Sequence, residues 1–367
     1  MFSKEEIERY NRHIILPEIG LQGQEKLKNA KVLVVGAGGL GCPVLQYLTA
    51  AGVGTIGICD FDFVDVSNLQ RQLLYENSDI GKAKAIVAAE KLSKINPFAG
   101  FQVHYQLLRK ENVMEIFKPY DIIVDATDNF PTRFLINDAC IILNKPFVFG
   151  AIYRFEGQVS VFNYNGGPTY RCLVPEEPSE DEAPSCSQIG VMGVLPGLIG
   201  CYQAIEVIKI ICTTGKVMSG QILVIDTLNL YHQIIGIQRN EGASNIKELG
   251  DYADFCSISK PGIRQLNPFE LNDLIQNGKA RTIDIRDREK FGRYHIQSNN
   301  VPVSDILNNL ELIPKNEQVV LLCEMGINSL ALIEYLIEHH NFKNLYNLNG
   351  GIMAWIKAGL PVIEEIK

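Results

Sequence analysis

The sequence predicts an α/β protein: a Rossmann-like, doubly wound sheet, extended by antiparallel strands and followed by a smaller α/β domain. Three observations support this expectation. Short apolar runs alternate with helical patterns from residue 31 to about residue 150. The pattern then changes to runs that resemble antiparallel strands, and a new compact unit begins near residue 263. The length of 367 residues agrees with two domains, because one domain typically has roughly 100 to 200 residues.

In the first part of the chain, strand patterns and helix patterns follow one another without interruption. "KVLVVG" at 31–36 is typical of a buried parallel strand, and the helical pattern after it ends at Gly52. Further strands are expected at 55–60, 102–108, 120–127 and 146–151, and helices at 42–52, 82–96 and 132–144, with one more between 108 and 120. Sheets of this kind bind ligands at the carboxyl ends of their strands.

Antiparallel strands are expected at 156–167 and within 222–239. Between them, residues 168–188 contain four prolines and five acids and show no hydrophobic periodicity. This segment is too long for an idle connection, so two interpretations stay open: a surface insertion, or an active-site lid that carries Cys186. In residues 189–212, glycines and Pro196 interrupt the first half, and Gln203, Glu206 and Lys209 form a polar stripe in the second. We therefore expect a loop and a largely buried helix rather than a membrane span.

A polar, irregular stretch at 239–262 separates the two domains. We expect a first domain at 1–245, a linker at 246–262 and a second domain at 263–367. In the second domain, strands are expected at 280–287, 317–326 and 343–351, and a helix at 328–340.

The composition narrows the classes of function. A net charge of −8 argues against a general binder of nucleic acids or anionic membranes, which would need a basic face. The charged N-terminal segment lacks the apolar core of a secretion signal, so a cytoplasmic location is expected. Nine scattered cysteines do not form a small disulfide framework. Five of them lie in apolar patterns and are expected to fill cores: Cys42, Cys59, Cys140, Cys201 and Cys212.

A glycine motif follows the first predicted strand. Gly36, Gly38 and Gly41 match G-x-G-x-x-G, and Asp60 closes the next strand roughly 20 residues further on, as in dinucleotide-binding folds. By this motif alone the protein would be a nicotinamide dehydrogenase. The motif is weak evidence by itself, so the residues that follow it decide which nucleotide is bound.

The polar residues beyond Asp60 favour a triphosphate. The chain supplies an amide at Asn68, cations at Arg71 and Lys84, and a carboxylate at Asp128. These groups suit ATP with Mg²⁺, because adenylyl transfer depends on positioning and on neutralising the charge of phosphate oxygens. A hydride-transfer enzyme does not need them. The alternative is that each residue is an ordinary surface charge. This alternative does not account for three clusters of such polar residues within 70 positions of the chain.

Four segments, "GAGGLG", "DFDFVDVSNLQRQ", "GKAKA" and "DATDN", together resemble the adenylating domain of the MoeB/ThiF/HesA family, bacterial relatives of the ubiquitin-activating enzymes. The resemblance runs from about Tyr10 to about Arg239. It implies a nucleotide site made of Gly36, Gly38, Gly39, Gly41, Asp60, Ser67, Asn68, Arg71, Lys84, Asp128 and Asn129.

The same resemblance assigns roles. Asp60 would bind the ribose, Asn68, Arg71 and Lys84 the phosphates, and Asp128 the Mg²⁺. "RYNRHIIL" matches the family's N-terminal motif, so Arg12 is expected to reach across a homodimer into the partner's site. The implied reaction converts ATP and the C-terminal glycine carboxylate of a ubiquitin-like sulfur carrier, which ends in Gly-Gly, into an acyl-adenylate and pyrophosphate. Adenylation turns a poor electrophile into one from which a thiol or persulfide displaces AMP.

Three cysteines bear on this resemblance. Relatives usually bind structural zinc with two C-x-x-C pairs, but Pro175 stands where the partner of Cys172 belongs, and only Cys256 lies near the other expected pair. Since a tetrahedral cysteine site needs four ligands, we expect no zinc. Cys186 aligns with a cysteine that relatives keep in a crossover loop. It is a candidate nucleophile that displaces AMP, and the alternative is an exposed thiol without a role.

The second domain resembles a rhodanese domain over residues 263–367. "TIDIRDREKFGRYHI", "VVLLCEMGINS" and "NGGIMAWIKAGLPV" carry the resemblance. Cys323 ends a strand and opens a tight loop before a helix, where N–H groups and the positive helix end can hold a persulfide. The alternative is a buried strand-end cysteine. Asn328 replaces the arginine of the usual C-x-x-G-x-R-S loop, so we expect a persulfide relay fed by a cysteine desulfurase, with weak activity on thiosulfate.

Together these resemblances imply an enzyme that activates a sulfur carrier with ATP and then transfers sulfur from Cys323, producing a thiocarboxylate for molybdopterin or thiamin synthesis. A second interpretation keeps adenylation but assigns a non-protein substrate, such as the tRNA of the threonylcarbamoyladenosine dehydratases. A third makes the rhodanese unit a docking or redox-sensing module without turnover. The dehydrogenase interpretation is disfavoured.

Overall fold

The computed structural model describes residues 2–176, 190–250, 252, 263–324 and 326–363. The chain divides into two compact units, Met1–Ala253 and Asp254–Lys367. Each unit has its own sheet and its own buried apolar side chains.

The first unit is built on an eight-stranded sheet. Its strands are β1 (Lys31–Val35), β2 (Thr55–Cys59), β3 (Gly100–His104), β4 (Ile122–Asp125), β5 (Phe147–Tyr153), β6 (Glu156–Phe162), β7 (Gln221–Asp226) and β8 (Tyr231–Gly236). They lie in the order β3-β2-β1-β4-β5-β6-β7-β8. Strands β3, β2, β1, β4 and β5 pair in parallel with their neighbours in this order. Strands β6, β7 and β8 continue the sheet in antiparallel pairs. This confirms the predicted doubly wound sheet with an antiparallel extension.

Strand β1 lies at the point where the direction of strand addition reverses. Its Val32 pairs with Ile56 of β2 on one side and with Ile122 of β4 on the other. Because β1 and β4 are neighbours in the sheet, the loops that leave their carboxyl ends lie side by side. In open α/β sheets this is where ligands bind.

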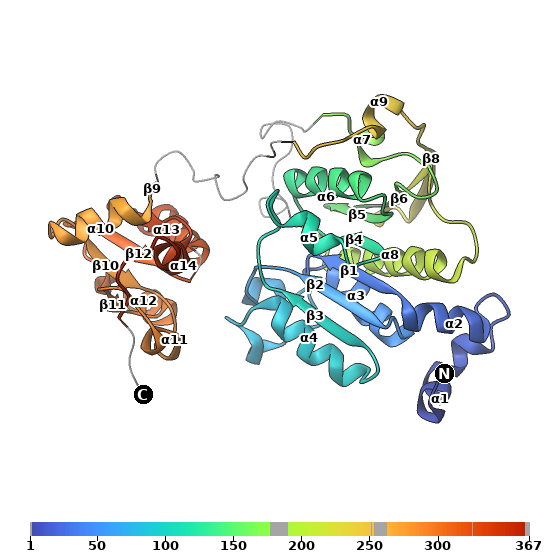
Figure 1. The fold of residues 1–367 in the computed structure, drawn as a ribbon, viewed down its shortest axis with the longest axis horizontal. Coiled ribbons are helices and arrows are strands. Elements are labelled where there is room, and N and C mark those ends of the chain that lie inside the picture. Colours follow the sequence, from blue (N-terminus) through green and yellow to red (C-terminus); the bar gives the residue numbers. More distant parts are fainter. Residues whose placement is uncertain (1, 177–189, 251, 253–262, 325, 364–367) are drawn as a thin grey trace. The chain divides into compact units, whose positions relative to one another are not determined.

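Helices cover both faces of this sheet (Figure 1). The helices of this unit are α1 (Lys4–Ile14), α2 (Gly20–Asn29), α3 (Gly41–Ala51), α4 (Lys84–Ile95), α5 (Val113–Phe117), α6 (Phe130–Ile142), α7 (Tyr170–Leu173), α8 (Val194–Cys212) and α9 (Glu241–Ser244), with 3₁₀ turns η1 (Val66–Asn68) and η2 (Asn77–Asp79). Side chains of α2, α3, α4 and α8 share one apolar core with the sheet. Those of α5, α6 and α7 share a second core on the opposite face.

Helix α8 differs from the expectation for residues 189–212, because part of the predicted loop is helical. Pro196 lies in the first turn of α8, where its missing N–H has no partner to lose. Gln203 and Glu206, two residues of the predicted polar stripe, are buried and hydrogen-bonded inside the protein. The helix is long and apolar enough to cross a membrane. It packs against β5, β6, α2 and α3, however, as a core helix does.

Strand β3 also differs from the prediction, since it ends at His104 rather than at residue 108. It is the edge strand, and its neighbour β2 ends at Cys59, which pairs with His104. Among the described residues, no strand pairs with the chain beyond His104. Of the five cysteines expected in cores, Cys42, Cys59, Cys140 and Cys212 are buried and Cys201 is half-buried.

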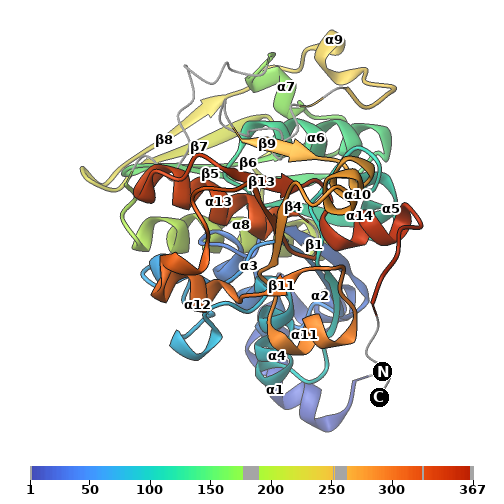
Figure 2. The same ribbon diagram turned by 90° about the vertical axis from the view of Figure 1, so that its left-hand side faces the viewer.

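The second unit has a parallel five-stranded sheet. Its strands are β9 (Arg264–Leu266), β10 (Arg281–Asp284), β11 (Asn299–Asn300), β12 (Val319–Leu322) and β13 (Leu345–Leu348), in the order β11-β10-β12-β13-β9. Its helices are α10 (Pro268–Gln276), α11 (Arg288–Arg293), α12 (Val303–Asn308), α13 (Ile327–His340) and α14 (Gly351–Lys357), with a 3₁₀ turn η3 (Leu310–Leu312). Figure 2 shows α12 and α13 on one side of this sheet and α10 and α14 on the other. Correspondingly, side chains of α12 and α13 belong to one apolar core, and side chains of α10 and α14 belong to another.

Candidate functional site

The glycine loop after β1 lies against the loop after β4. Gly36 has φ +96°, a left-handed conformation that side chains rarely adopt. A Cβ at Gly36 would lie 2.5 Å from the carbonyl oxygen of Ala126, and one at Gly41 would overlap the carbonyl oxygen of Gly36. These two glycines are therefore required by packing: Gly36 by the neighbouring loop and Gly41 by the start of α3.

The middle of the loop is built differently. A Cβ at Gly38 would meet only Gln72 Nε2, at an ordinary 3.5 Å, so packing leaves the backbone of Gly38 accessible to a ligand. A Cβ at Gly39 would lie 3.0 Å from Pro196 and 3.6 Å from Arg71 Cδ. The start of α8 and the Arg71 side chain thus border the glycine loop.

Side chains from three elements fix the peptide of Ala37 between these glycines. Its N–H donates to Asp60 Oδ2 at 2.7 Å, and its carbonyl accepts from the hydroxyl of Tyr75 at 2.9 Å. Cys42 Sγ lies 3.4 Å from the same carbonyl. The loop is therefore held in one shape before any ligand binds, which lowers the cost of ordering it.

Asp60 is a carboxylate with two backbone donors in a poorly hydrated position. Besides Ala37, the N–H of Asp62 donates to its Oδ1 at 2.8 Å. Burial raises the pKa of Asp60 from an ordinary 3.8 to about 6, and the charge of Asp62 adds to this, while Lys84 and the two N–H donors act in the other direction. The carboxylate thus has spare acceptor capacity and a strong preference for additional donors.

Lys84 opens α4 next to this carboxylate. It is 5% exposed, and its Nζ lies 3.1 Å from Oδ2 of the largely exposed Asp62. A buried ammonium with one exposed partner can exchange that partner for phosphate oxygens. The Lys84 position is thus suited to binding phosphate beside the glycine loop.

The "SNLQRQ" segment forms the third side of the site. Asp65 caps η1 by accepting from the N–H of Ser67 at 2.8 Å, and Asn68 Oδ1 accepts from the N–H of Asp65. Arg71 Nη1 donates to the carbonyl of Ser67 at 3.0 Å. Ser67 is exposed and Asn68 and Arg71 are half-buried, so these polar groups are accessible from solvent.

The two predicted residues after β4 differ in their surroundings. Asn129 is the N-cap of α6, and its Oδ1 accepts from the N–H of Thr132 at 2.9 Å. This accounts for Asn129 structurally without any ligand. Asp128 is exposed, two residues beyond the carbonyl of Ala126 that contacts Gly36. The structure therefore brings Asp128 to the same sheet edge as the glycine loop.

A buried polar cluster beneath Asp128 was not predicted. Asp125, 0% exposed, accepts from the N–H and hydroxyl of Thr127 and lies 3.8 Å from Arg133 Nε. Arg133 also donates to the carbonyl of Thr127, and Gln203 of α8 donates to the carbonyl of Asp125 at 2.6 Å. Burial raises the pKa of Asp125, with Arg133 opposing this. The cluster fixes the loop that carries Asp128 against α6 and α8.

Arg12 lies away from the nucleotide loop of its own chain. Its neighbour Arg9 donates to the carbonyl of Ile95, and Tyr10 accepts from Asn96, so α1 packs at the carboxyl end of α4. Lys84 is at the other end of this helix of 12 residues, which is about 18 Å long. Arg12 is exposed and, within the part of the chain that the structure describes, it makes no hydrogen bond or ion pair.

Cys172 lies in a polar nest between α7 and α9. N–H groups of Thr169 and Asn240 donate to its sulfur at 3.4 and 3.3 Å, and the hydroxyl of Ser244 is 3.6 Å away. Burial alone would raise the pKa of Cys172, but these hydrogen bonds outweigh it, so its pKa lies below the ordinary value. In the described residues, no group of three His, Cys, Asp or Glu side chains is arranged for a metal ion. Cys186 and Cys256 lie outside the described residues.

In the second unit, Cys323 follows β12 directly and is 3% exposed. The N–H of Ser329, in the first turn of α13, donates to its sulfur at 3.4 Å. The hydroxyl of Ser329 is 3.2 Å from that sulfur and 2.6 Å from Asn347 Oδ1. First-turn N–H groups have no partner within the helix and carry its positive end, so they stabilise negative charge on sulfur.

The "NGG" segment and the start of α14 pack directly against the cysteine loop. N–H groups of Ile352 and Met353 donate to the carbonyls of Cys323 and Glu324 at 3.0 Å each. A Cβ at Gly351, whose φ is +61°, would overlap the carbonyl of Cys323. Asn328, at the position of the missing arginine, is half-buried.

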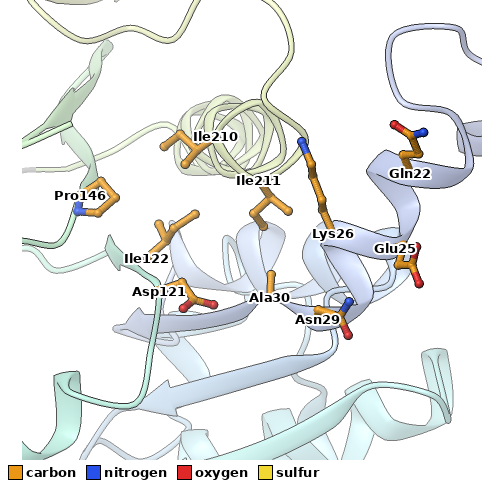
Figure 3. A pocket seen from close by; sticks show the side chains of 10 residues that line it. All are labelled: Gln22, Glu25, Lys26, Asn29, Ala30, Asp121, Ile122, Pro146, Ile210 and Ile211. Atoms are coloured by element: carbon orange, nitrogen blue, oxygen red, sulfur yellow. The ribbon is translucent and has the colours of Figure 1, made fainter. Parts of the chain in front are cut away.

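A cavity of about 670 Å³ lies elsewhere on the first unit (Figure 3). Ala30, just before β1, and Asp121 and Ile122, at the start of β4, line it together with residues of α2 and the end of α8. It is thus at the amino ends of the strands, opposite the glycine loop. Its polar side chains Lys26 and Asp121 already bond to Thr213 and to the N–H of Lys31.

Comparisons with known proteins agree with this geometry. The family model described as "ThiF family" matches residues 10–245, and a rhodanese-like domain matches residues 267–358. The chain is 41% identical over 373 residues to the probable adenylyltransferase/sulfurtransferase MoeZ of Mycobacterium tuberculosis, covering 98% of this chain and 95% of that protein. It is 47% identical to the sulfur carrier protein adenylyltransferase of Thermus thermophilus, covering 70% of this chain and 99% of that protein.

A solved structure supports the fold. The crystal structure of MccB from E. coli with ATP superimposes with a TM-score of 0.59 at 21% identity, covering 65% of this chain and 73% of that chain. The sheet order, the glycine loop at its switch point and the family matches lead to one conclusion. The chain belongs to the ThiF family and carries a C-terminal rhodanese-like domain.

Proposed function

We propose that the protein activates the C-terminal carboxylate of a ubiquitin-like sulfur carrier with ATP and then transfers sulfur to it from Cys323. The observation that carries this proposal is that one chain holds both a pre-shaped glycine loop bordered by cations and a cysteine whose sulfur accepts from the first-turn N–H of Ser329. Relatives whose names combine adenylyltransferase and sulfurtransferase match almost the whole chain.

In the first step, the carrier's terminal carboxylate attacks the α-phosphorus of ATP, and pyrophosphate leaves. We assign the ribose hydroxyls to Asp60, which has spare acceptor capacity, and the phosphates to Asn68, Arg71 and Lys84. The accessible backbone at Gly38 would approach the phosphates most closely. Two cations near the leaving pyrophosphate offset the charge that develops on it.

Asp128 fits a magnesium ligand. It is an exposed carboxylate at the carboxyl edge of the sheet, and Mg²⁺ in such sites is bound by one or two carboxylates together with substrate phosphates. When bound there, Mg²⁺ would neutralise phosphate charge. The Asp125 cluster holds the Asp128 loop in place.

We further propose that the active form is a homodimer in which Arg12 completes the partner's site. Arg12 is exposed and lies at the far end of α4 from Lys84 of its own chain. An exposed apolar stripe supports a subunit interface: Val194, Leu198 and Ile205 share one side of α8, and Tyr47 of α3 is exposed beside Cys201. A mixture of Arg12→Ala and Arg71→Ala subunits tests this, because mixed dimers retain one intact site and regain activity only if Arg12 acts in trans.

In the second step, the persulfide of Cys323 attacks the acyl-adenylate. The terminal sulfur forms a bond to the acyl carbon and AMP leaves, giving an acyl disulfide with Cys323. A second thiol then attacks the Cys323 sulfur, so the carrier thiocarboxylate leaves and a disulfide remains on the enzyme. Cys186 stays the candidate nucleophile for the alternative route, in which it displaces AMP from the carrier itself, and a cysteine desulfurase is the proposed source of the sulfur.

Pyrophosphate exchange with candidate carriers tests the proposal most directly. Carriers that end in Gly-Gly should stimulate exchange between ATP and labelled pyrophosphate, and truncated carriers without the last glycine should not. Mass spectrometry should then detect the carrier with one oxygen replaced by sulfur. The same panel distinguishes molybdopterin carriers from thiamin carriers. If no carrier stimulates exchange, the proposed function is wrong.

A further inference from the structure

The residue after Cys323 carries an acidic side chain whose position is fixed by two other groups. Glu324 Oε2 accepts from Arg286 Nη1 at 2.9 Å, and its Oε1 accepts from the hydroxyl of Tyr294. The Glu324 side chain is 35% exposed. Its carboxylate therefore lies at the solvent side of the cysteine loop, in a fixed orientation.

Arg286, the arginine of the "TIDIRD" segment, is the cation that bonds to Glu324, and its charge is already paired with another carboxylate. It is 5% exposed and forms a bidentate ion pair with the fully buried Asp284, with Nη2 2.8 Å from Oδ2. Nη2 also donates to the carbonyl of Tyr294 at 2.7 Å, and the guanidinium lies 4.9 Å from the Tyr294 ring. The remaining nitrogen, Nη1, donates to Glu324 Oε2.

The charges of this group do not cancel. Asp284 and Glu324 contribute two negative charges, and Arg286 contributes one positive charge. Burial and the bond to Glu324 raise the pKa of Tyr294 to about 12, so its hydroxyl remains a neutral donor. Asn328 adds no charge on the other side of the loop. The cluster beside the Cys323 loop is thus negative by one charge.

We infer that Glu324 determines donor specificity at Cys323 by excluding anionic sulfur donors and favouring donors that bring a positive charge. The inference rests on the proposed sulfur transfer at Cys323 and names the residue that selects its donor. A donor such as thiosulfate brings two negative charges to the sulfur of Cys323, the residue directly before Glu324. Glu324 also occupies Nη1 of Arg286, so this arginine does not offer that donor to an incoming anion.

The step under selection is attack of the Cys323 thiolate on a sulfane sulfur. With thiosulfate, a bond forms between Cys323 Sγ and the terminal sulfur, the S–S bond of thiosulfate breaks, and sulfite leaves with the electron pair. Cyanide then removes the bound sulfur as thiocyanate and restores the thiolate. With the persulfide of cysteamine, the same bond forms and cysteamine leaves as its thiolate, while its ammonium group can face Glu324.

Glu324→Gln tests the charge without a change of shape. In the full-length protein, the ratio of kcat/KM for thiosulfate to that for cysteamine persulfide should rise about tenfold, because one unit charge is removed near the incoming donor. The gain should shrink with added salt. Glu324→Asp keeps the charge and should leave the ratio near that of the wild type.

The matched control is Glu317→Gln. Glu317 precedes β12, at the opposite end of the strand from Glu324, and pairs with Arg281 on the surface at 3.2 Å. This variant loses the same charge from the same domain and should not change the ratio. An unchanged ratio in Glu324→Gln, or an equal rise in Glu317→Gln, overturns the inference. If wild-type Cys323 takes up no sulfur from either donor, the proposed sulfur transfer itself fails and the specificity assignment fails with it.

Discussion

Asp60 offers a sharp test of the nucleotide site, because its carboxylate titrates within an accessible pH range. It accepts from two backbone N–H groups, and burial raises its pKa to about 6. If its remaining lone pairs accept ribose hydroxyls, the ionised form binds ATP better than the protonated form. We therefore expect ATP affinity to fall as the pH drops through 6.

The size of the effect follows from the titration. With a pKa of about 6, roughly nine-tenths of the Asp60 side chains are ionised at pH 7 and roughly one-tenth at pH 5. A ligand that binds only the ionised form thus loses about tenfold in affinity. The sign for stability is the opposite: because the folded pKa lies above the ordinary 3.8, the contribution of Asp60 is full below about pH 4 and is lost as the pH rises through 6.

The assay compares wild type with Asp60→Asn by calorimetric ATP titration at pH 5 and pH 7. Since ATP phosphates titrate equally in both experiments, the ratio of the two affinities isolates Asp60. The ratio of the wild-type affinity to the Asp60→Asn affinity should be about tenfold higher at pH 7 than at pH 5. Asp121→Asn, at the opposite edge of the sheet, should follow the wild type at both pH values. A wild-type to Asp60→Asn ratio that does not change with pH refutes the ribose role of Asp60.

Three further predictions follow from packing and buried charge. Gly41→Ala should destabilise the first unit by about 1 to 3 kcal/mol, because its added Cβ overpacks the glycine loop. Gly38→Ala should leave the melting temperature unchanged and weaken ATP binding. Equal melting temperatures for the two variants would contradict this. Asp138→Asn should cost about 3 to 5 kcal/mol in urea unfolding, because Asp138 is buried, pairs with Arg171 at 2.8 Å and accepts from Tyr252; a change within error would show that the pair is not coupled to folding. Metal analysis of the purified protein should find no stoichiometric zinc, and Cys172→Ala should lower stability by about 1 to 2 kcal/mol; one zinc per chain would contradict the assignment of Cys172 to a hydrogen-bonded nest.

The nucleotide loop could be predicted because its requirements are local. Gly36 needs a left-handed conformation and Gly41 needs close contact within a few residues of chain, so both leave a sequence signature. Asp60 also follows directly from the end of a recognisable strand. The roles of these residues toward ATP stay predictions.

Residues that act through distant partners could not be predicted in the same way. Gln203 meets Asp125 across 78 positions, and Cys172 meets Asn240 across 68. In the sequence, Gln203 has the spacing of a polar stripe on a helix, and the packing of α8 against β5 makes it a buried donor. Cys172 likewise has the sequence signature of an incomplete zinc site. Its distant partners Asn240 and Ser244 lie in the polar stretch at 239–262, which shows no hydrophobic periodicity.

Short elements were also missed in the second unit. Strands β9 and β11 have three and two residues, too few for a periodic signal. Cys323 was placed correctly at the end of β12, but the contact of Ser329 with Asn347 depends on pairing between β12 and β13. Glu324 was visible in the loop sequence without any sign that Arg286 and Tyr294 hold it.

The central claim, that one chain activates a carrier and then supplies its sulfur, is tested by Cys323→Ser in a coupled assay. With a responsive Gly-Gly carrier, ATP and a persulfide donor, this variant should keep carrier-stimulated pyrophosphate exchange at the wild-type rate and form no carrier thiocarboxylate by mass spectrometry. Undiminished thiocarboxylate formation by Cys323→Ser would contradict the claim, because the sulfur would then reach the carrier by a route that does not pass through Cys323.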